Sequence, residues 1–222
     1  PKQCYINPRE GAIGCFEEAC RNVVCTGAKP IGMLDHLQFG NPTDPEIFWT
    51  FLESLKGLTD FAKDFEIPCV GGKVSLYNET SDGPIKPTPV IGVIGLIDKK
   101  PLKIQKINSG DSLIMIGDTK DELGGSEYAE YIHKFIGGKC PTVNFSESKK
   151  NMTSVLDIIE NELIKSAHDC SKGGLTIAIS ELCMMNQIGC NVSLEKIPGE
   201  KLDSDKILFS ESHSRYLVTF EN

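Results

Sequence analysis

The stretch from which the fold can be read is Asp35-His36-Leu37-Gln38-Phe39-Gly40-Asn41-Pro42. Apolar residues 31–34 precede it and predict a short strand, which then enters a loop over residues 36–42. A long helix is expected next, because Asp44 is a suitable N-cap and Pro45 fits the first helical turn. A carboxylate at a strand end before a Gly/Asn/Pro loop can orient a ribose, a base edge or a metal. A helix-entry loop that satisfies only its own hydrogen bonds is the simpler alternative.

Strands and helices alternate on both sides of this stretch. In the first half, residues 12–26 show helical periodicity, Pro68 ends the long helix, and residues 69–72, 74–77 and 89–97 read as extended. In the second half, strands are expected at residues 112–117, 166–168, near Val192 and at 216–220, with helices over residues 151–165 and 175–186. The pattern predicts an α/β or α+β architecture with two domains, residues 1–100 and 101–222.

The segment between the two predicted domains, residues 98–108, carries four lysines around Pro101. A lysine cluster this short more often belongs to a solvated linker than to a binding patch. The four are Lys99, Lys100, Lys103 and Lys106.

Composition narrows the classes of function. The net charge of −8 argues against a general nucleic-acid binder, because phosphate backbones select basic surfaces. No apolar run approaches the roughly 20 residues that cross a bilayer, and no signal-peptide pattern opens the sequence. The nine cysteines include no C-x-x-C pair, so we expect small buried thiols in a reducing cytoplasm rather than a metal centre.

The glycine pair Gly71-Gly72 follows a short predicted strand and precedes Lys73-Val74-Ser75. Paired glycines let backbone N–H groups approach phosphate closely, while the lysine adds charge and the serine a hydroxyl. The stretch is not a Walker A loop, because Ile67 stands where that motif needs its first glycine and Val74 where it needs Ser or Thr. From the residues alone, a tight structural turn explains the pattern equally well.

Two further polar stretches lie beside predicted strands in the second half. Residues 168–175 form a strand-to-helix turn whose helix N-terminus could receive an anion, or could serve only as a capping turn. Residues 211–215 include Ser212 and His213, which together suggest a hydrolase. Neighbouring residues on a strand point to opposite faces, however, and no G-x-S-x-G elbow is present, so we set that interpretation aside.

Taken in order, these stretches resemble the second half of the large synthase subunit of formylglycinamide ribonucleotide amidotransferase, also called phosphoribosylformylglycinamidine synthase. The resemblance covers nearly the whole chain, and its Phe-Gly-Asn-Pro and Ser-Leu-Tyr-Asn-Glu stretches are its most specific parts. It implies a fold like aminoimidazole ribonucleotide synthetase: an N-terminal domain that pairs with its like to build a β-barrel, then a second α/β domain, here incomplete. The matching segments are residues 18–22, 35–42, 72–80, 86–90, 122–126, 168–175 and 211–215.

The resemblance also implies chemistry. ATP would activate the amide oxygen of formylglycinamide ribonucleotide as a phosphate ester, and glutamine-derived ammonia would displace phosphate. Asp35 and Gly72 match family positions that contact ATP, and Ser75 matches a substrate contact. Position 73 is a family Mg²⁺ ligand, usually Asn, but Lys73 has no lone pair to offer a metal. The family's acid/base histidines belong to the other half, so no catalytic residue is assigned.

By tandem-repeat logic, a second, pseudo-symmetric site is expected in the second domain. Its candidates are Asp169, Glu211, Ser212 and His213. The partners implied by the resemblance are a glutaminase subunit, a small bridging subunit and a second copy of the first domain, with no nucleic acid and no membrane. Two alternatives stay open: a non-catalytic nucleotide-binding or scaffold half, or a related ATP-using synthetase or kinase such as a thiamine-phosphate kinase.

Overall fold

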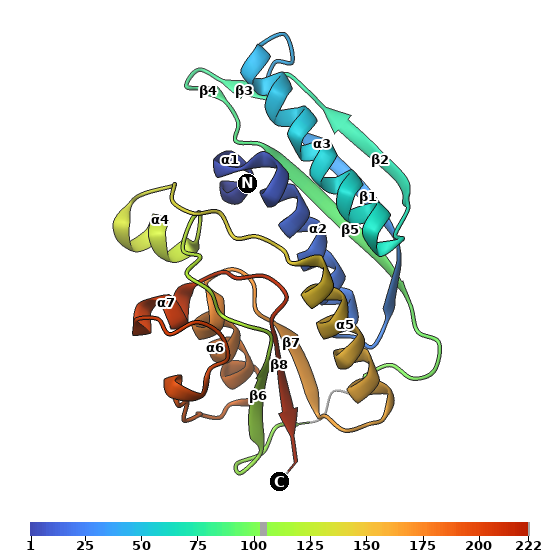
Figure 1. The fold of residues 1–222 in the computed structure, drawn as a ribbon, viewed down its shortest axis with the longest axis vertical. Helices are drawn as coiled ribbons and strands as arrows, with labels where there is room; N and C mark the ends of the chain where they lie inside the picture. The colour runs from blue at the N-terminus through green and yellow to red at the C-terminus, as the bar shows by residue number, and fades with distance from the viewer. Residues whose placement is uncertain (103–105, 222) are drawn as a thin grey trace.

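The first half of the chain folds into a sheet covered by two helices. The computed structural model describes residues 1–102 and 106–221. Strand β1 (Lys29–Gln38) lies between β2 (Cys69–Ser75), which runs parallel to it, and β5 (Thr88–Leu96), which runs antiparallel. Helices α2 (Pro8–Val24) and α3 (Pro45–Phe65) pack against each other over one face of this sheet (Figure 1). Helix α1 (Lys2–Ile6) precedes them, and β3 (Glu79–Thr80) and β4 (Gly83–Pro84) form a small hairpin.

The second half builds a second three-stranded sheet in the order β6-β8-β7, with both neighbouring pairs antiparallel. Helix α5 lies beside α2, and α6 and α7 lie on the other side of this sheet (Figure 1). The elements are β6 (Ser112–Ile116), α4 (Glu127–His133), α5 (Phe145–Glu160), β7 (Ser166–Asp169), α6 (Gly174–Asn186), the 3₁₀ turn η1 (Leu194–Lys196), α7 (Ser204–Phe209) and β8 (Tyr216–Phe220).

Alternation along β8 divides the apolar residues between two cores. Tyr216 and Val218 point into the larger core, which also holds Phe16 of α2 and Phe61 of α3. Leu217 points to the opposite face, into a smaller core with residues of α6. Because successive strand residues face opposite sides, β8 joins the two layers, and the larger core runs continuously from the first sheet to the second.

Local signals explain several boundaries. Asp44 caps α3 as predicted, accepting hydrogen bonds from the N–H groups of Glu46 (2.9 Å) and Ile47 (3.4 Å). The helix ends at the left-handed residue Glu66, two residues before Pro68, which also agrees with the prediction. Strands at the positions of β5, β6 and β8 and the helix α6 are confirmed within a residue.

Other expectations were wrong. The loop was expected over residues 36–42, but residues 36–38 continue β1, because β2 and β5 pair with them on both sides. No strand forms near Val192 in the described chain; the 3₁₀ turn η1 follows it instead. Helix α5 begins at Phe145, where Asn144 caps it, and not near residue 151. The short helices α1, α4 and α7 were not predicted. Residues 98–102 and 106–108 form neither helix nor strand, and Lys103 lies outside the described residues.

Among residues 1–102 and 106–221, none of the helices has both the length and the apolar character that crossing a bilayer requires.

Candidate functional site

The candidates of the first domain come together on β1 and β2. Asp35 is paired with Gly72 in the parallel register, and its carboxylate fills the space where a side chain at position 72 would begin. A Cβ built on Gly72 would lie 1.8 Å from Oδ1 of Asp35. Glycine at position 72 is therefore a condition for this placement of the carboxylate.

One side chain, Asn78, ties together the two stretches that carry the resemblance. Its Nδ2 donates to the carbonyl of Phe39 (3.0 Å) and to the carbonyl of Ser75 (2.9 Å). The hydroxyl of Ser75 donates to Oδ1 of Asn78 at 3.3 Å. The N–H of Tyr77, in turn, donates to the carbonyl of Gly40 at 2.9 Å. The strand ends and the following loops thus form one hydrogen-bonded unit that fixes Ser75.

Lys73 is exposed on β2, where the register pairs it with His36. Its ammonium group can donate to phosphate but cannot ligate a metal. Among the described residues, no group of three or more His, Cys, Asp or Glu side chains is arranged to hold a metal ion. Asp35 is the carboxylate of this cluster, and magnesium is commonly held by one or two carboxylates together with substrate phosphates. Of the two family positions, Asp35 therefore has the oxygen ligands that magnesium requires and Lys73 does not.

A cavity of about 310 Å³ lies between the two halves of the chain. Its walls come from α1 and α2, from the start of β5, and from the loops before α4, α6 and β8. Several of the polar or charged side chains in its lining are Lys2, Glu18, Glu127, Lys172, Glu211 and His213. Ile91 also lines it and is paired with Asp35 on the neighbouring strand, so the two groups of candidates are one strand apart.

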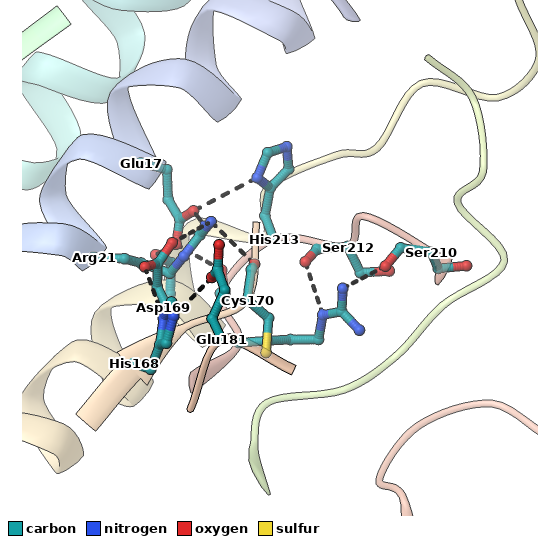
Figure 2. Close-up of polar contacts among 12 residues, drawn as sticks. Glu17, Arg21, His168, Asp169, Cys170, Glu181, Ser210, Ser212 and His213 are labelled. Carbon is teal, nitrogen blue, oxygen red and sulfur yellow. Dashed lines mark hydrogen bonds and ion pairs between the residues drawn. The ribbon is translucent and has the colours of Figure 1, made fainter. Parts of the chain in front are cut away.

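A buried charge network from α2 borders this cavity, whose lining includes Arg21 and His213. Figure 2 shows the contacts of the network. Glu17 and Arg21, one helical turn apart and fully buried, form an ion pair. Nη2 of Arg21 donates to the carbonyl of Cys170 (3.3 Å) and lies 3.7 Å from Oδ2 of Asp169. Such a pair is tolerated in an apolar interior when further hydrogen bonds satisfy its atoms. Both carboxylate oxygens of Glu17 and both terminal nitrogens of Arg21 have partners here, whereas Nε of Arg21 has none in the described structure. The network therefore joins α2 to the end of β7.

His213 is the least satisfied member of the network. The side chain is buried, its Nδ1 lies 3.6 Å from Oε2 of Glu17, and neither ring nitrogen has a hydrogen-bond partner in the described structure. The Glu17 carboxylate is already engaged by Arg21 and by the hydroxyls of Ser148 (3.0 Å) and Ser214 (3.2 Å). Burial, followed by the positive charge of Arg21, holds the pKa of His213 well below 6.5. A neutral imidazole thus faces the cavity with hydrogen-bonding capacity to spare.

Glu211 and Ser212 instead make structural contacts. Oε1 of Glu211 accepts from the N–H of Glu127 (2.7 Å) and of Gly173 (2.8 Å), which connects the beginnings of α4 and α6. Burial raises the pKa of Glu211, although these two N–H groups oppose the shift. The hydroxyl of Ser212 accepts from the N–H of Lys120 at 3.1 Å. Both side chains hold the loop before β8 in place.

Arg215 organises the same loop from inside. It is fully buried, and its Nε donates to the carbonyl of Ser212 (2.9 Å) while its Nη2 donates to that of Ser210 (2.5 Å). Its Nη1 donates to the hydroxyl of Thr119 at 3.1 Å. These bonds fix the backbone on which Glu211 and His213 stand.

The carboxylate of Asp169 has two charged neighbours, His168 and Arg21. Burial works to raise the pKa of Asp169, but the neighbouring His168, whose Nδ1 lies 3.6 Å from Oδ1, and the charge of Arg21 outweigh it, and the pKa is lowered. His168 also lies 2.9 Å from Oε2 of Glu181 through Nε2. The neighbouring Asp169 carboxylate is the largest cause of a raised His168 pKa. The pair favours an ionised carboxylate next to a protonated imidazole.

Two of the second-domain candidates, Glu211 and His213, line the cavity. Ser212 lies between them in the loop before β8, and Asp169 lies beside Arg21 in the buried network. The structure places the first-domain candidates in a separate cluster on β1 and β2. Sequence reasoning did not single out Glu17 or Arg21. A usable signal was present, because two opposite charges four residues apart lie on the otherwise apolar face of a predicted helix.

Comparisons with known proteins match both halves of the chain. A family model described as AIR synthase related protein, N-terminal domain, matches residues 1–97. A second, described as AIR synthase related protein, C-terminal domain, matches residues 108–222.

Curated relatives match along the whole chain. The chain is 44% identical over 225 residues to phosphoribosylformylglycinamidine synthase subunit PurL of Methanocaldococcus jannaschii, covering 98% of this chain and 31% of the relative. It is 41% identical to the PurL subunit of Alkaliphilus metalliredigens, covering 99% of this chain and 30% of the relative. The chain thus spans about a third of the length of these relatives. The predicted resemblance is confirmed.

Solved structures agree on the fold. T. maritima PurL complexed with FGAR matches with a TM-score of 0.80 at 22% identity, over 99% of this chain and 36% of that one. Thiamine monophosphate kinase from Aquifex aeolicus matches with a TM-score of 0.60 at 14% identity, over 97% and 73% of the two chains. At these identities the likeness shows the fold alone, and the predicted synthetase-like α/β class is confirmed.

Proposed function

The chain belongs to the AIR synthase related protein family, and from this premise we propose that it is part of an ATP-dependent ligase of purine biosynthesis. The reaction would convert formylglycinamide ribonucleotide, ATP and glutamine-derived ammonia to formylglycinamidine ribonucleotide. The observation that carries the proposal is the 44% identity with a PurL subunit over 98% of the chain. Cytoplasmic location, a glutaminase subunit and a small bridging subunit are parts of the same proposal.

In this proposal the first-domain cluster contacts nucleotide and substrate. Asp35 and Gly72 contact ATP, and the glycine leaves the room that the Asp35 carboxylate occupies beside the nucleotide. Ser75, fixed by Asn78, positions the substrate. ATP supplies the phosphoryl group that activates the amide oxygen, and Lys73 compensates phosphate charge from its exposed position on β2. Magnesium, where bound, would share Asp35 with the phosphates.

The second-domain cluster supports a different role. Glu211 and Ser212 are occupied by backbone contacts, and Arg21, Asp169 and Arg215 are buried in the same framework. These contacts favour a site that supports the fold, with His213 as its free hydrogen-bonding group. A scaffold half that binds nucleotide without turning it over is therefore the second candidate function.

A chimaera tests the ligase proposal. The matching segment of the M. jannaschii PurL subunit is replaced by this chain, and product formation is measured with formylglycinamide ribonucleotide, ATP and ammonium. We expect formylglycinamidine ribonucleotide from the chimaera and none from the 222-residue chain alone, because the acid/base residues that the resemblance implies belong to the other half. A folded, ATP-binding chimaera without product, beside an active parent enzyme, would support the scaffold role instead.

A further inference from the structure

The sheet of the second domain has two edge strands that differ in their protection. β7, at one edge, has only four residues and includes His168 and Asp169. β6, at the other edge, reads Ser-Leu-Ile-Met-Ile, without a charge, a proline or a shift in register. Native proteins usually shorten, charge or bend their edge strands, because an open edge invites another strand to pair with it. β6 lacks these features and presents an unprotected edge.

A groove runs along this edge of β6. Two cavities, of about 460 Å³ and 420 Å³, adjoin each other and share the lining residues Leu113, Ile179 and Asn191. β6 lies along one side of the groove, and residues 188–193 lie along the other. In the described chain, no backbone hydrogen bond crosses the groove to residues 113–116. Open space therefore separates the edge of β6 from the next segment of chain.

The floor of the groove is the smaller apolar core of the second domain. Leu175 and Leu217 are buried there, whereas Ile179, Ile188 and Ile197 pack against this core and stay partly exposed. Apolar side chains that entered the groove would remove this surface from water, which favours binding.

Beyond β6, another segment of the chain already pairs beside it. Thr119 and Gly199 form an isolated parallel bridge, in which the N–H of Thr119 donates to the carbonyl of Pro198 (2.9 Å). The N–H of Glu200 donates in turn to the carbonyl of Thr119 (3.0 Å). Val192, where the sequence predicts a strand, borders the groove and is 39% exposed, and in the described chain it has no strand partner. A strand placed in the groove would have β6 on one side and the segment around Val192 on the other.

We propose that this groove binds an extended polypeptide segment, which adds a strand to the free edge of β6. The backbone of the segment pairs with β6, and every second side chain is apolar and enters the groove. A small apolar molecule would cover the floor but would leave the N–H and C=O groups of the edge unpaired, which is why the unprotected edge favours a polypeptide.

The source of the segment is the same synthase polypeptide, and this part of the inference rests on the proposed function. The chain covers 31% of the M. jannaschii PurL subunit, so a synthase of that length contains further segments that can reach the groove. The proposal thus assigns β6 as a point where the second domain is joined to another part of the enzyme.

The test compares the 222-residue chain with the chimaera that contains it in the M. jannaschii subunit, by hydrogen–deuterium exchange and mass spectrometry. About half of the amides of an edge strand point away from its neighbour, and we expect those of β6 to exchange fast in the isolated chain. In the chimaera, this fast-exchanging fraction should be lost from β6 and from the segment around Val192. β7, the other edge strand, should keep its exchange rates and is the internal control.

Two variants of α6 test the groove itself within the chimaera. Ile179→Trp fills the floor and should leave the outward amides of β6 in fast exchange. Ile177→Trp, at a side chain 42% exposed on the same helix, should leave them protected. Far-ultraviolet circular dichroism checks that both variants fold, and the comparison of the two unmodified proteins stands without them.

Three results would overturn the proposal. One is fast exchange of the outward β6 amides in the chimaera. Another is equal protection of β6 in the isolated chain, which would assign the edge to a second copy. The third is slower exchange of β6 and β7 alike, which would reflect a general gain in stability. Product formation is no part of this readout, so an inactive chimaera with a protected β6 would count against the ligase function and support the strand site.

Discussion

The imidazole of His213 packs directly on the backbone of Gly14. A Cβ built on Gly14 would lie 2.4 Å from Nε2 and 2.5 Å from Cε1 of the ring. Gly14 is in the middle of α2, where glycine ordinarily costs helix stability relative to alanine. Glycine at position 14 of α2 therefore leaves the space in which the His213 ring is buried.

Gly14→Ala should destabilise the fold despite its better helix propensity. The buried ring has little room to move, so we expect a loss of about 1–3 kcal/mol, the usual cost of overpacking a core. Chemical denaturation measures the free energy of unfolding. Gly92→Ala is the matched control, because nothing lies within 4 Å of its Cβ position. In Gly14→Ala/His213→Ala much of the loss should be recovered; a Gly14→Ala variant as stable as wild type would contradict the contact.

Stability should depend on pH through His213. Its folded pKa lies well below 6.5, so the folded chain keeps the ring neutral where the unfolded chain already binds a proton. Acid therefore favours unfolding: the contribution is complete above about pH 6.5 and falls by about 1.4 kcal/mol for each pH unit below it, until the folded pKa is reached. Urea unfolding between about pH 5.5 and 7.5 measures the slope.

The control for this slope is His213→Gln, which keeps a polar group of similar size without a titration in this range. Arg21, Arg215 and Lys120 face His213 with positive charge and remain in both proteins. His168 has a raised pKa, so its contribution is lost as pH rises and opposes that of His213. Equal slopes for wild type and His213→Gln would show that the histidine is not held neutral.

The uncovered face of the first sheet should mediate self-association. Leu34 of β1 and Ile94 of β5 are exposed on the face opposite α2 and α3, whereas Met33 and Leu37 point to the helices. Contiguous exposed apolar surface of this kind marks an interaction site. We expect a dimer by light scattering at micromolar concentration. Ile94→Glu should give monomers, and Met185→Glu, at a side chain 78% exposed on α6, should not.

A monomeric wild-type chain at that concentration would contradict the dimer. So would a dimer that Ile94→Glu leaves intact while Met185→Glu disrupts it, because the contact would then involve α6.

Sequence reasoning found most long elements, because their signals are local. Asp44 and Pro45 define the start of α3 without help from the rest of the chain. It missed the extent of β1, because residues 36–38 include two polar side chains and lead directly into the Gly/Asn/Pro stretch at residues 40–42. Only the flanking strands β2 and β5, distant in sequence, hold them extended.

The candidate site was predicted unevenly for the same reason. Motif residues such as Asp35 and Gly72 could be found in sequence, and their pairing explains why a glycine is needed. The ion pair of Glu17 and Arg21 meets Asp169 only through tertiary contact, so its role was not apparent from the residues.

The last prediction concerns Lys73, a lysine where the family usually places a metal-binding Asn. If its ammonium compensates phosphate charge, Lys73→Ala should weaken ATP binding by about 1–3 kcal/mol, the scale of a charge-assisted hydrogen bond. Lys73→Asn should restore affinity only with magnesium present, because an amide oxygen can ligate the metal whereas an ammonium group cannot. Titration calorimetry with and without magnesium measures both. Lys150→Ala, at an exposed lysine on α5, is the control. Unchanged affinity in Lys73→Ala would mean that the lysine only points to solvent and that the glycines make a structural turn.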